Sequence, residues 1–431
     1  MARYEIYDDG VASFWDITLS GRTYTVRWGR VPSRGQSQVK HFDDEGEARA
    51  AYDKQISAKV KKGYRLVKGT EEPEAIVRPP AQDVIAPRNA QLEAAAQLDP
   101  NDEGPLLVLG DWLQSQGDPR GELLALQVAQ KKKSNDPTGF VMLKKAIDAH
   151  YAAHEAALLG PVYPARHLIK LEWNLGFIRA ARISYDAAHE DDPPMAEVLK
   201  ELAALPSAVV LQELALGNPG EVKGTRGRYA EVLEALFASR QPSTLRTLFL
   251  GDVWPGHRPL PYGLLGDLRE LGDAFPKLTR LVIANGFVRW SDVELPKLTQ
   301  LEHKADLDAD AMDWLSANVF PELTKLTLTI HQYQTEHPFT QKRFPQLRQL
   351  RLLDTVGTRA WLEVLLGSGL LPQLESIDLD DGDLDDHGAN YLLEHWASFA
   401  HLRTIRLGKQ HLSWAAVKRL RELQVNLLDP K

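Results

Sequence analysis

A leucine pattern recurs through more than half of the chain and constrains its fold more than any other feature. Each unit has the form L-x-x-L-x-L, and a proline commonly stands two residues before the first leucine. Such a unit forms a short strand and a helical return, and it buries its apolar residues only when neighbouring units stack on it. The proline stops each return before the next strand begins. Seven units fit well and begin at Leu211, Leu245, Leu278, Leu323, Leu347, Leu374 and Leu402, with weaker members at Ile178 and Leu298.

The stacked units predict a curved solenoid over residues 161–431, with the strands lining its concave face. Tryptophans in the returns are predicted to fill the space between layers: Trp314, Trp361, Trp396 and Trp414.

Side chains alternate along a strand, so the residue between the last two apolar positions of each unit points to the open side. These residues are apolar in the N-terminal half of the array and charged with mixed sign in the C-terminal half, which favours a protein partner over a polyanion. The alternative is an ordinary solvated sheet face. The predicted protein-binding residues are Arg182, Phe249, Val282, Glu302, Arg351, Asp378 and Arg406, in a row completed by Ala215 and Thr327. Neighbouring outward positions add Glu213, Arg280, Gln300, Lys325, Gln349 and Arg403.

The first seventy residues follow a different pattern. Apolar and polar residues alternate in short runs over 2–7, 13–19, 24–28 and 38–42, which predicts a small antiparallel sheet. A helical period follows over 45–61. Residues 1–70 hold 13 Lys and Arg against 9 Asp and Glu, whereas the whole chain has a net charge of −8. A phosphate-binding surface needs clustered charge, so this excess alone does not identify a nucleic-acid partner.

Two further segments separate this opening piece from the repeats. Four prolines between residues 70 and 88 predict a semi-extended linker, and residues 89–160 have a helical pattern. The predicted fold class is multidomain α/β: a small antiparallel sheet plus helix over 1–69, the linker over 70–88, a helical domain over 89–160, and the solenoid over 161–431.

The composition excludes several classes of site. The chain has no cysteine, so it has no disulfide framework, thiolate metal site or cysteine nucleophile. Neither a secretory signal nor an apolar run long enough for a membrane span is present, so we expect a cytoplasmic protein without a membrane partner. We expect no catalytic residues, no metal and no cofactor, because phosphate loops are missing and the paired histidines His150 and His154 lack a third zinc ligand.

Four elements stand in order in the opening segment: Trp28-Gly29-Arg30, Gly35-Gln36, a helix with Ala48 and Tyr52, and Lys61-Lys62-Gly63-Tyr64. Together they resemble the WGR domain, which is found beside the catalytic domain of DNA-dependent poly(ADP-ribose) polymerases and in many bacterial proteins. The resemblance covers residues 1 to about 68. Pro32 departs from the pattern, because many members have Gly in that turn, so the backbone there would approach a ligand less closely. No room remains in the chain for the transferase domain that accompanies WGR in the polymerases.

The resemblance implies a sequence-independent contact with the end of a nucleic acid. By position, Trp28 would pack on a terminal sugar and Arg30 would be its electrostatic partner, with Gln36, Lys40 and Lys62 as further candidates. An indole face beside a guanidinium suits such a contact. Two alternatives remain open: WGR domains also contact neighbouring protein domains, and Trp28 can simply complete the core of the small domain.

The motif Asp111-Trp112-Leu113 and the run from Gly117 to Glu122, GDPRGE, resemble the bacterial repeat-companion domain, which characteristically precedes leucine-rich repeats. The rest of the chain resembles an irregular leucine-rich repeat array. From the residues, we predict that Asp118 caps the helix that starts near Pro119, that Arg120 is a buried ion-pair partner, and that Trp112 is a core residue.

Three functional hypotheses follow. The first is a non-enzymatic adaptor that holds a nucleic-acid end at the WGR surface and a protein on the concave face, of unknown oligomeric state. The second is a purely protein-recognising molecule, such as a substrate, sensor or inhibitor partner of another enzyme. The third is a hydrolase with a dispersed site, for which the sequence nominates no residues.

Overall fold

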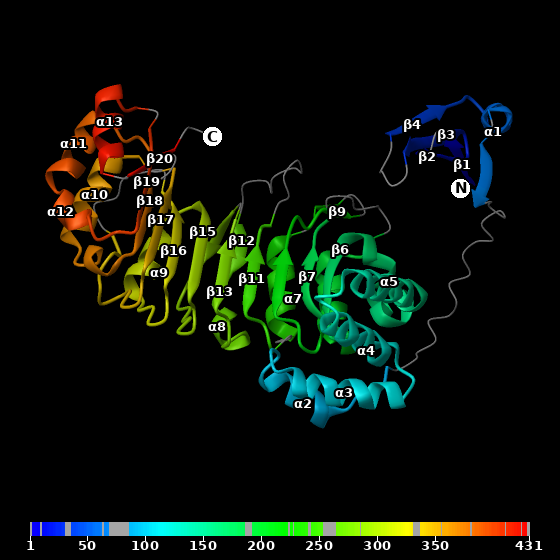
Figure 1. Cartoon of the computed structure of the whole chain (residues 1–431), viewed down its shortest axis with the longest axis horizontal. Helices are drawn as coiled ribbons and strands as arrows, with labels where there is room; N and C mark the ends of the chain where they lie inside the picture. The colour runs from blue at the N-terminus through cyan, green and yellow to red at the C-terminus, as the bar shows by residue number, and fades with distance from the viewer. Residues whose placement is uncertain are drawn as a thin grey trace. The chain divides into compact units, whose positions relative to one another are not determined.

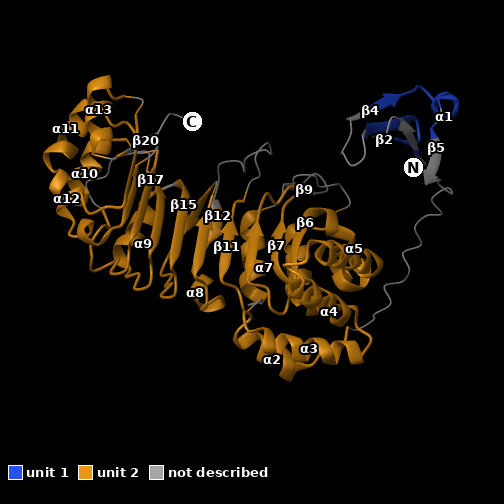
Figure 2. Ribbon diagram, viewed as in Figure 1, with its two compact units in different colours: residues 1–84 blue, residues 85–431 orange. Residues whose placement is uncertain are grey.

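The computed structural model divides the chain into two compact units, residues 1–84 and 85–431 (Figure 2). The predicted linker, 70–88, lies almost wholly outside the described residues. The structure describes all of the chain except residues 1, 9–10, 31–35, 63, 69–85, 186–191, 223–224, 227, 240–242, 253–263, 285, 331–336, 355, 380–381, 410, 424 and 429–431.

The described part of residues 1–84 forms a five-stranded antiparallel sheet of order β4-β3-β2-β1-β5 and one helix, which confirms the predicted small sheet plus helix and adds the strand β5. Asp44 caps the helix, since its side chain accepts a hydrogen bond from the N–H of Glu47, and the helix has acidic residues in its first turn and lysines in its last. The elements are β1 (Ala2–Asp8), β2 (Val11–Ser20), β3 (Thr23–Arg30), β4 (Gln36–His41), α1 (Glu45–Lys61) and β5 (Arg65–Lys68).

The core of this first unit lies between the sheet and α1. Tyr4, Trp15, Ile17, Tyr24 and Val26 are buried, and side chains of α1 pack against them. These five residues share one face of the sheet, because the strand pairing places Tyr4 opposite Trp15 and Ile17 opposite Val26. The α1 residues that cover this face are Ala51, Tyr52 and Ile56.

Residues 85–431 begin with helices, α2 (Ala90–Leu98), α3 (Glu103–Ser115), α4 (Pro119–Lys132) and α5 (Pro137–Leu159), followed by the 3-10 helix η1 (Gly160–Leu168). Asp118 caps α4 and Pro119 is its first residue, as predicted. The Arg120 guanidinium binds the Asp118 carboxylate at 2.9 Å, and both side chains are 4% exposed, so the prediction of a buried ion pair is also confirmed.

The helical segment and the repeats share a core. Leucines of α3 and α4 pack in one buried cluster with Leu175, Phe177, Val209 and Val210, which belong to the repeat region. Trp112 is half-buried at the margin of this cluster. Residues 89–160 and 161–431 therefore lie in one compact unit, where the sequence predicts two domains.

An eleven-stranded sheet runs through the rest of the second unit. Its order is β20-β19-β18-β17-β16-β15-β13-β11-β8-β7-β6, so the strands lie side by side in chain order (Figure 1). Only the β6-β7 pair is antiparallel. The strands are β6 (Ile169–Asn174), β7 (Phe177–Ile183), β8 (Glu213–Leu216), β11 (Thr247–Leu250), β13 (Arg280–Ile283), β15 (Gln300–Asp306), β16 (Lys325–Thr329), β17 (Gln349–Leu353), β18 (Ser376–Leu379), β19 (Thr404–Gly408) and β20 (Asn426–Leu428).

Helical segments join most of these parallel strands, because a parallel pair needs a crossover connection. They are α6 (Met195–Ala204), η2 (Pro206–Ala208), α7 (Tyr229–Ser239), α8 (Leu271–Ala274), α9 (Ala309–Ala317), α10 (Thr358–Gly367), η3 (Leu371–Gln373), α11 (Asp386–Glu394), α12 (Trp396–Phe399) and α13 (Trp414–Glu422). Two small strand pairs stand outside the large sheet: β9 (Glu221–Val222) with β10 (Thr225–Arg226), and β12 (Leu264–Asp267) with β14 (Phe287–Arg289).

The repeated apolar residues form the core of the second unit, as the pattern predicts. The second apolar position of each unit lies in register from β8 to β19, and none of these residues is more than 5% exposed: Leu214, Leu248, Leu281, Leu301, Leu326, Leu350, Ile377 and Ile405. No helix of the described residues has the length and apolar character needed to cross a membrane.

The four tryptophans predicted to fill the space between layers differ in burial. Trp314 and Trp361 are buried, as predicted, and Trp396 is half-buried. The prediction for Trp414 is wrong, since this side chain is 78% exposed. The buried residues of α13 are Ala416 and Leu420, and a residue two positions before Ala416 lies roughly 200° away around the helix.

Candidate functional site

Strand pairing places the predicted protein-binding residues in one row across the large sheet, which we call the open row. Each member lies opposite the next on the neighbouring strand, so the predicted alignment is confirmed. The row continues from Lys170 on β6 to Asn426 on β20. In order, its members are Lys170, Arg182, Ala215, Phe249, Val282, Glu302, Thr327, Arg351, Asp378, Arg406 and Asn426.

A second row runs parallel to the open row, two residues earlier in each strand. It contains five of the predicted outward positions, but β19 contributes Thr404 and not Arg403, which precedes the strand. Its members are Glu213, Thr247, Arg280, Gln300, Lys325, Gln349, Ser376 and Thr404.

Val282 does not reach the surface. Its side chain is 0% exposed, so the prediction that it contacts a partner is wrong. Val282 lies between Phe249 and Glu302 on the two neighbouring strands, about 4.8 Å away on either side. The Phe249 ring is in turn held beneath Arg280, whose guanidinium carbon lies 5.0 Å from the ring centroid.

Arg182 is half-buried and held by the protein itself. Its guanidinium donates to the carboxylate of Asp252 at 2.5 Å and to the backbone carbonyl of Asp252 at 3.2 Å. The side chain of Arg182 is 14% exposed. The N-terminal part of the open row therefore offers less accessible surface than the sequence predicts.

The C-terminal part of the open row lines a shallow cleft of about 470 Å³, which we call the sheet cleft. Its walls come from β15 to β19 and from the residues just before β18 and β19. Asp378 lies between two arginines, at 3.2 Å from Arg351 and 3.4 Å from Arg406. Glu375 binds Arg403 at 3.1 Å.

Glu302 lies at the other end of the sheet cleft and is also shared by two cations. Its carboxylate is 2.6 Å from Arg280 and 2.7 Å from Lys304. Burial raises the pKa of Glu302, but hydrogen bonds from Lys304 and Arg280 lower it by more, so its pKa lies below the ordinary value. Glu302 therefore stays ionised and orders the two cations beside it.

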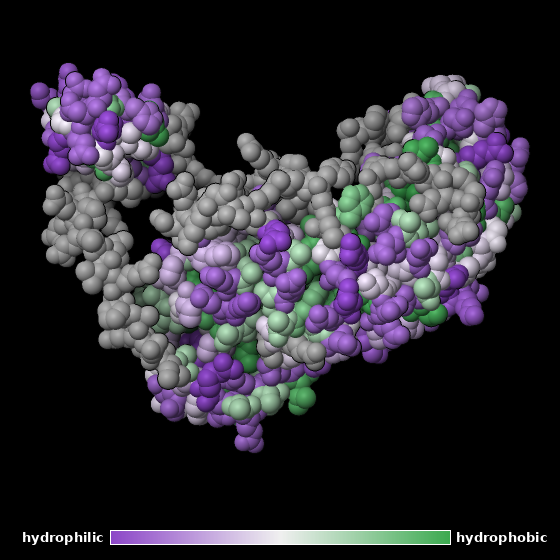
Figure 3. Space-filling model, turned by 180° about the vertical axis from the view of Figure 1, so that it is seen from behind, coloured by the Kyte–Doolittle hydropathy of each residue, from purple (hydrophilic) through white to green (hydrophobic). Residues whose placement is uncertain are grey.

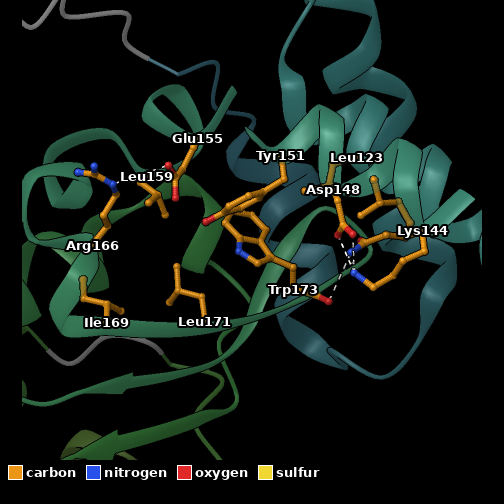
Figure 4. A pocket seen from close by; sticks show the side chains of 12 residues that line it. Leu123, Lys144, Asp148, Tyr151, Glu155, Leu159, Arg166, Ile169, Leu171 and Trp173 are labelled. Carbon is orange, nitrogen blue, oxygen red and sulfur yellow. Dashed lines mark hydrogen bonds and ion pairs between the residues drawn. The ribbon is translucent and has the colours of Figure 1, made fainter. Parts of the chain in front are cut away.

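A second hollow, of about 390 Å³, lies between α4, α5 and β6 (Figure 4). Trp173 and Tyr151 meet edge to face in it, with ring centroids 5.6 Å apart. Two ion pairs close its sides, Lys144 with Asp148 at 2.6 Å and Arg166 with Glu155 at 3.7 Å. Its charged groups thus neutralise one another in pairs, which gives no excess charge for recognising an ion.

The structure brings together no metal-binding group among the residues that it describes. His150 and His154 lie on α5 with ring centroids 4.6 Å apart, and the Nε2 of His150 is 2.9 Å from the carbonyl oxygen of Pro119. On the face of residues 85–431 seen in Figure 3, hydrophobic side chains are interspersed among hydrophilic ones.

In the first unit, Trp28 and Gln36 are direct neighbours across the β3-β4 pair. On its other side Trp28 pairs with Trp15, which is 2% exposed. Trp28 itself is half-buried and packs against the core between the sheet and α1. Its indole therefore supports the fold and is only partly accessible.

The C-terminal end of α1 brings lysines to the same group of aromatic residues. The Nζ of Lys59 lies 5.3 Å from the ring centroid of Trp15 and 4.6 Å from that of Tyr64. Burial lowers the pKa of Lys59, and the like charge of Lys62 lowers it further. Lys62 is exposed just past the end of α1.

Lys40 is exposed near the other end of β4. It pairs with Tyr24, four residues before Trp28, so it stands about 13 Å along the strand from the pair formed by Trp28 and Gln36. Its Nζ lies 5.4 Å from the ring centroid of Phe42.

Comparison with known proteins identifies this first unit, since residues 3–71 match the WGR domain family. Residues 3–71 form a WGR domain. Two proteins from Escherichia coli K12 are similar to the chain, each over 63 residues. The chain is 38% identical to the uncharacterized protein YfeS and 41% identical to the protein YehF. The match to YfeS covers 15% of this chain and 26% of YfeS, and the match to YehF covers 14% of this chain and 23% of YehF.

A solved structure of a protein from Bacteroides fragilis is similar to the whole chain at 20% sequence identity. The similarity covers 99% of this chain and 95% of that one, with a TM-score of 0.49.

Of the predicted nucleic-acid set, the structure shows only Trp28 and Gln36 to be neighbours, through their strand pairing. Trp28 and Gln36 are adjacent, Lys40 lies further along β4, and Lys62 follows α1. Arg30 ends β3 opposite Ser13, and its side chain lies outside the described residues. Sequence reasoning missed Lys59, although its position three residues after Ile56 places it on the stripe of α1 that faces the sheet.

Proposed function

We propose that the chain is a non-enzymatic adaptor or regulator with two recognition surfaces. In this proposal the WGR domain docks the end of a nucleic acid without reading its sequence, and the open row with the sheet cleft binds a protein. The linked surfaces would raise the effective concentration of one bound molecule near the other. The observation that carries the proposal is the open row, in which strand pairing aligns one residue from every strand of the large sheet.

We infer that the second unit is a leucine-rich repeat solenoid preceded by a repeat-companion segment. Such a unit would support the proposed role in protein binding. Sequential parallel strands, buried leucines in register and helical returns are the features of such an array. Its strand-lined face would then be the concave, partner-binding surface, and helices α2–α5 would cover the apolar end of the array through their shared core with β7.

The nucleic-acid part rests on the half-open indole of Trp28 and on lysines at the end of α1. A partly accessible indole and ammonium groups on one domain can supply stacking and phosphate contact without base reading. The test is fluorescence anisotropy of the full chain with blunt and overhanging short DNA duplexes at about 50 and 200 mM NaCl. We expect binding that falls with salt and weakens in Arg30→Ala and Lys62→Ala.

Trp28→Ala is a further variant, with circular dichroism to check folding because Trp28 also packs on the core. Arg49→Ala is the matched control, since Arg49 is exposed on α1 and pairs with Asp53. Absence of duplex binding at the lower salt concentration would refute nucleic-acid docking and leave the second candidate, a molecule that recognises only proteins.

The protein-binding part is tested by affinity capture from a bacterial lysate followed by mass spectrometry. Phe249→Ala combined with Arg351→Glu should abolish capture, and circular dichroism should show that the variant still folds although it loses the contacts with Arg280 and Asp378. Arg359→Glu is the matched control, because Arg359 lies on α10 and pairs with Glu363. Full capture by the double variant would show that the partner binds elsewhere.

A further inference from the structure

The large sheet ends at β6, and the structure describes no strand beyond it. In the antiparallel pair β6-β7, alternate residues of each strand direct both backbone groups at the partner strand. The N–H of Ser184 binds the carbonyl of Leu168, so Leu168 and every second residue after it face β7. The N–H and C=O groups of Ile169, Leu171 and Trp173 therefore point away from β7, to the outer edge of the sheet.

Two of these outward groups are used within the chain. The N–H of Ile169 binds the carbonyl of Arg166, and the carbonyl of Trp173 accepts from Gln127 at 3.4 Å. Among the described residues, none binds the carbonyl of Ile169, the N–H or carbonyl of Leu171, or the N–H of Trp173. These groups alternate along β6 as acceptor, donor, acceptor and donor. Their partial charges thus complement the backbone of another extended chain.

The side chains of the same three β6 residues line the hollow between α4, α5 and β6 (Figure 4), which we call the edge hollow. Leu171 and Trp173 are half-buried and pack against the core of the second unit. Tyr151 and Ile147 face them from α5. Side chains that lie opposite each other on adjacent strands share one face of the sheet and touch. A strand paired with β6 would therefore place every second side chain in the edge hollow.

The charged residues around the edge hollow favour an apolar side chain there. Each charged lining residue that the structure describes has a partner of opposite sign within the hollow, Lys144 with Asp148 and Arg166 with Glu155. A charge brought into this hollow would lose its water without gaining one of these partners outright. An apolar side chain would gain contact with the aromatic rings and lose nothing.

We propose that β6 binds an extended segment of a partner protein by strand addition, with apolar side chains at alternate positions of that segment in the edge hollow. Main-chain hydrogen bonds to the sheet edge would supply affinity, and the hollow would supply selectivity. The outward groups extend over about 13 Å from Ile169 to Trp173, so about five residues of the partner engage them. This surface is separate from the open row, since no residue of that row lines the hollow.

The test measures binding of the full chain to the fluorescein-labelled peptide Lys-Thr-Val-Thr-Leu-Thr-Val-Thr-Glu. Serine at its three apolar positions should weaken binding about tenfold or more, because the edge hollow then holds no apolar side chain. Two further peptides test the backbone. One is N-methylated at the three apolar residues and the other at the three threonines that follow them. A strand presents the N–H groups of alternate residues to each side, so we expect one methylated peptide to lose binding and the other to keep it.

Variants of the chain test the two parts of the surface. Leu171→Pro removes the outward N–H at the centre of the edge and leaves the bonds to β7 in place, because a proline is tolerated where an edge strand directs its N–H outward. It should weaken binding about tenfold or more with an unchanged circular dichroism spectrum, whereas Leu171→Val should retain most of the affinity. Ile147→Glu places a carboxylate in the hollow and should also weaken binding. Val141→Glu is its matched control, since Val141 is 53% exposed on the same helix and does not line the hollow.

Absence of binding by the parent peptide, or equal binding of the two methylated peptides, would overturn the proposal. So would binding that Leu171→Pro and Ile147→Glu both leave unchanged. Sedimentation of the full chain tests the other possible occupant. A dimer that Leu171→Pro converts to a monomer would show that a second copy of the chain, and not a partner segment, occupies the edge.

Discussion

Gly176 and Arg120 meet backbone to backbone: a Cβ on Gly176 would stand 2.4 Å from the carbonyl oxygen of Arg120. Gly176 lies in the turn between β6 and β7, and both turn residues have positive φ, 49° at Leu175 and 78° at Gly176. Such a two-residue turn suits the twist of a hairpin. The contact docks the first hairpin of the large sheet against the start of α4 and explains why the helical segment and the repeats form one unit.

Gly176→Ala should therefore destabilise the second unit by about 3 kcal/mol or more, because the methyl group must displace backbone as well as adopt a strained φ. Gly117→Ala is the matched control. Gly117 has a φ of 72° but no atom within 4 Å of its Cβ position, so only the conformational cost of about 1–2 kcal/mol applies. Calorimetry of the full chain would measure both changes. Equal losses in the two variants would show that the contact with Arg120 does not matter.

Asp118→Ala removes both a helix cap and the partner of a buried guanidinium. The loss of the cap costs about 1 kcal/mol, and an unpaired buried Arg120 costs about 3–5 kcal/mol. Asp102→Ala provides the comparison, because Asp102 caps α3 from an exposed position and binds only the N–H of Gly104. We expect Asp102→Ala to lower the free energy of unfolding by about 1 kcal/mol and Asp118→Ala by several times more. The prediction fails if the two variants unfold at the same temperature.

The sequence predicts the motif around Asp118 and Arg120 well because its interactions are local. The cap, the proline and the ion pair lie within three residues of one another, so their geometry follows from the start of a single helix. The contact between Arg120 and Gly176 joins residues far apart in the chain, and no local pattern encodes it. This is why the sequence predicts a helical domain but not its fusion with the sheet.

In the candidate site, too, some features could be predicted from the sequence and others could not, and the register of the strands explains the difference. The repeat pattern specifies which residue of each strand faces outward, so the alignment of Phe249, Glu302 and Arg351 could be predicted. The pattern does not show how far the surrounding side chains cover a given residue, and so the burial of Val282 could not be predicted. Nor does it reveal that Asp378 and Glu302 each bind two cations, since these contacts cross between strands or fold back within one.

Trp290 lies outside the repeat pattern, but we expect its side chain to contribute strongly to the free energy of unfolding. Its ring is fully buried and stacks on Trp314, with centroids 3.7 Å apart and an interplanar angle of 13°. Trp290→Ala should lower the free energy of unfolding by about 3–5 kcal/mol. Trp414→Ala removes a side chain that is 78% exposed and should change it by less than about 0.5 kcal/mol. Comparable effects of the two substitutions in a thermal melt would contradict the packing described here.

Glu302 should make stability depend on pH in the acid range. Burial opposes its ionisation, but Lys304 and Arg280 outweigh burial and hold its folded pKa below the ordinary value of 4.5. A carboxyl group with a lowered pKa stabilises the fold above its unfolded pKa, and this contribution disappears as the pH falls through the folded value. The chain should therefore melt at a higher temperature than Glu302→Gln at pH 6, and the difference should narrow steadily below about pH 4.5. A difference in melting temperature that stays constant between pH 6 and pH 3 would mean that the ion pairs of Glu302 contribute nothing to stability.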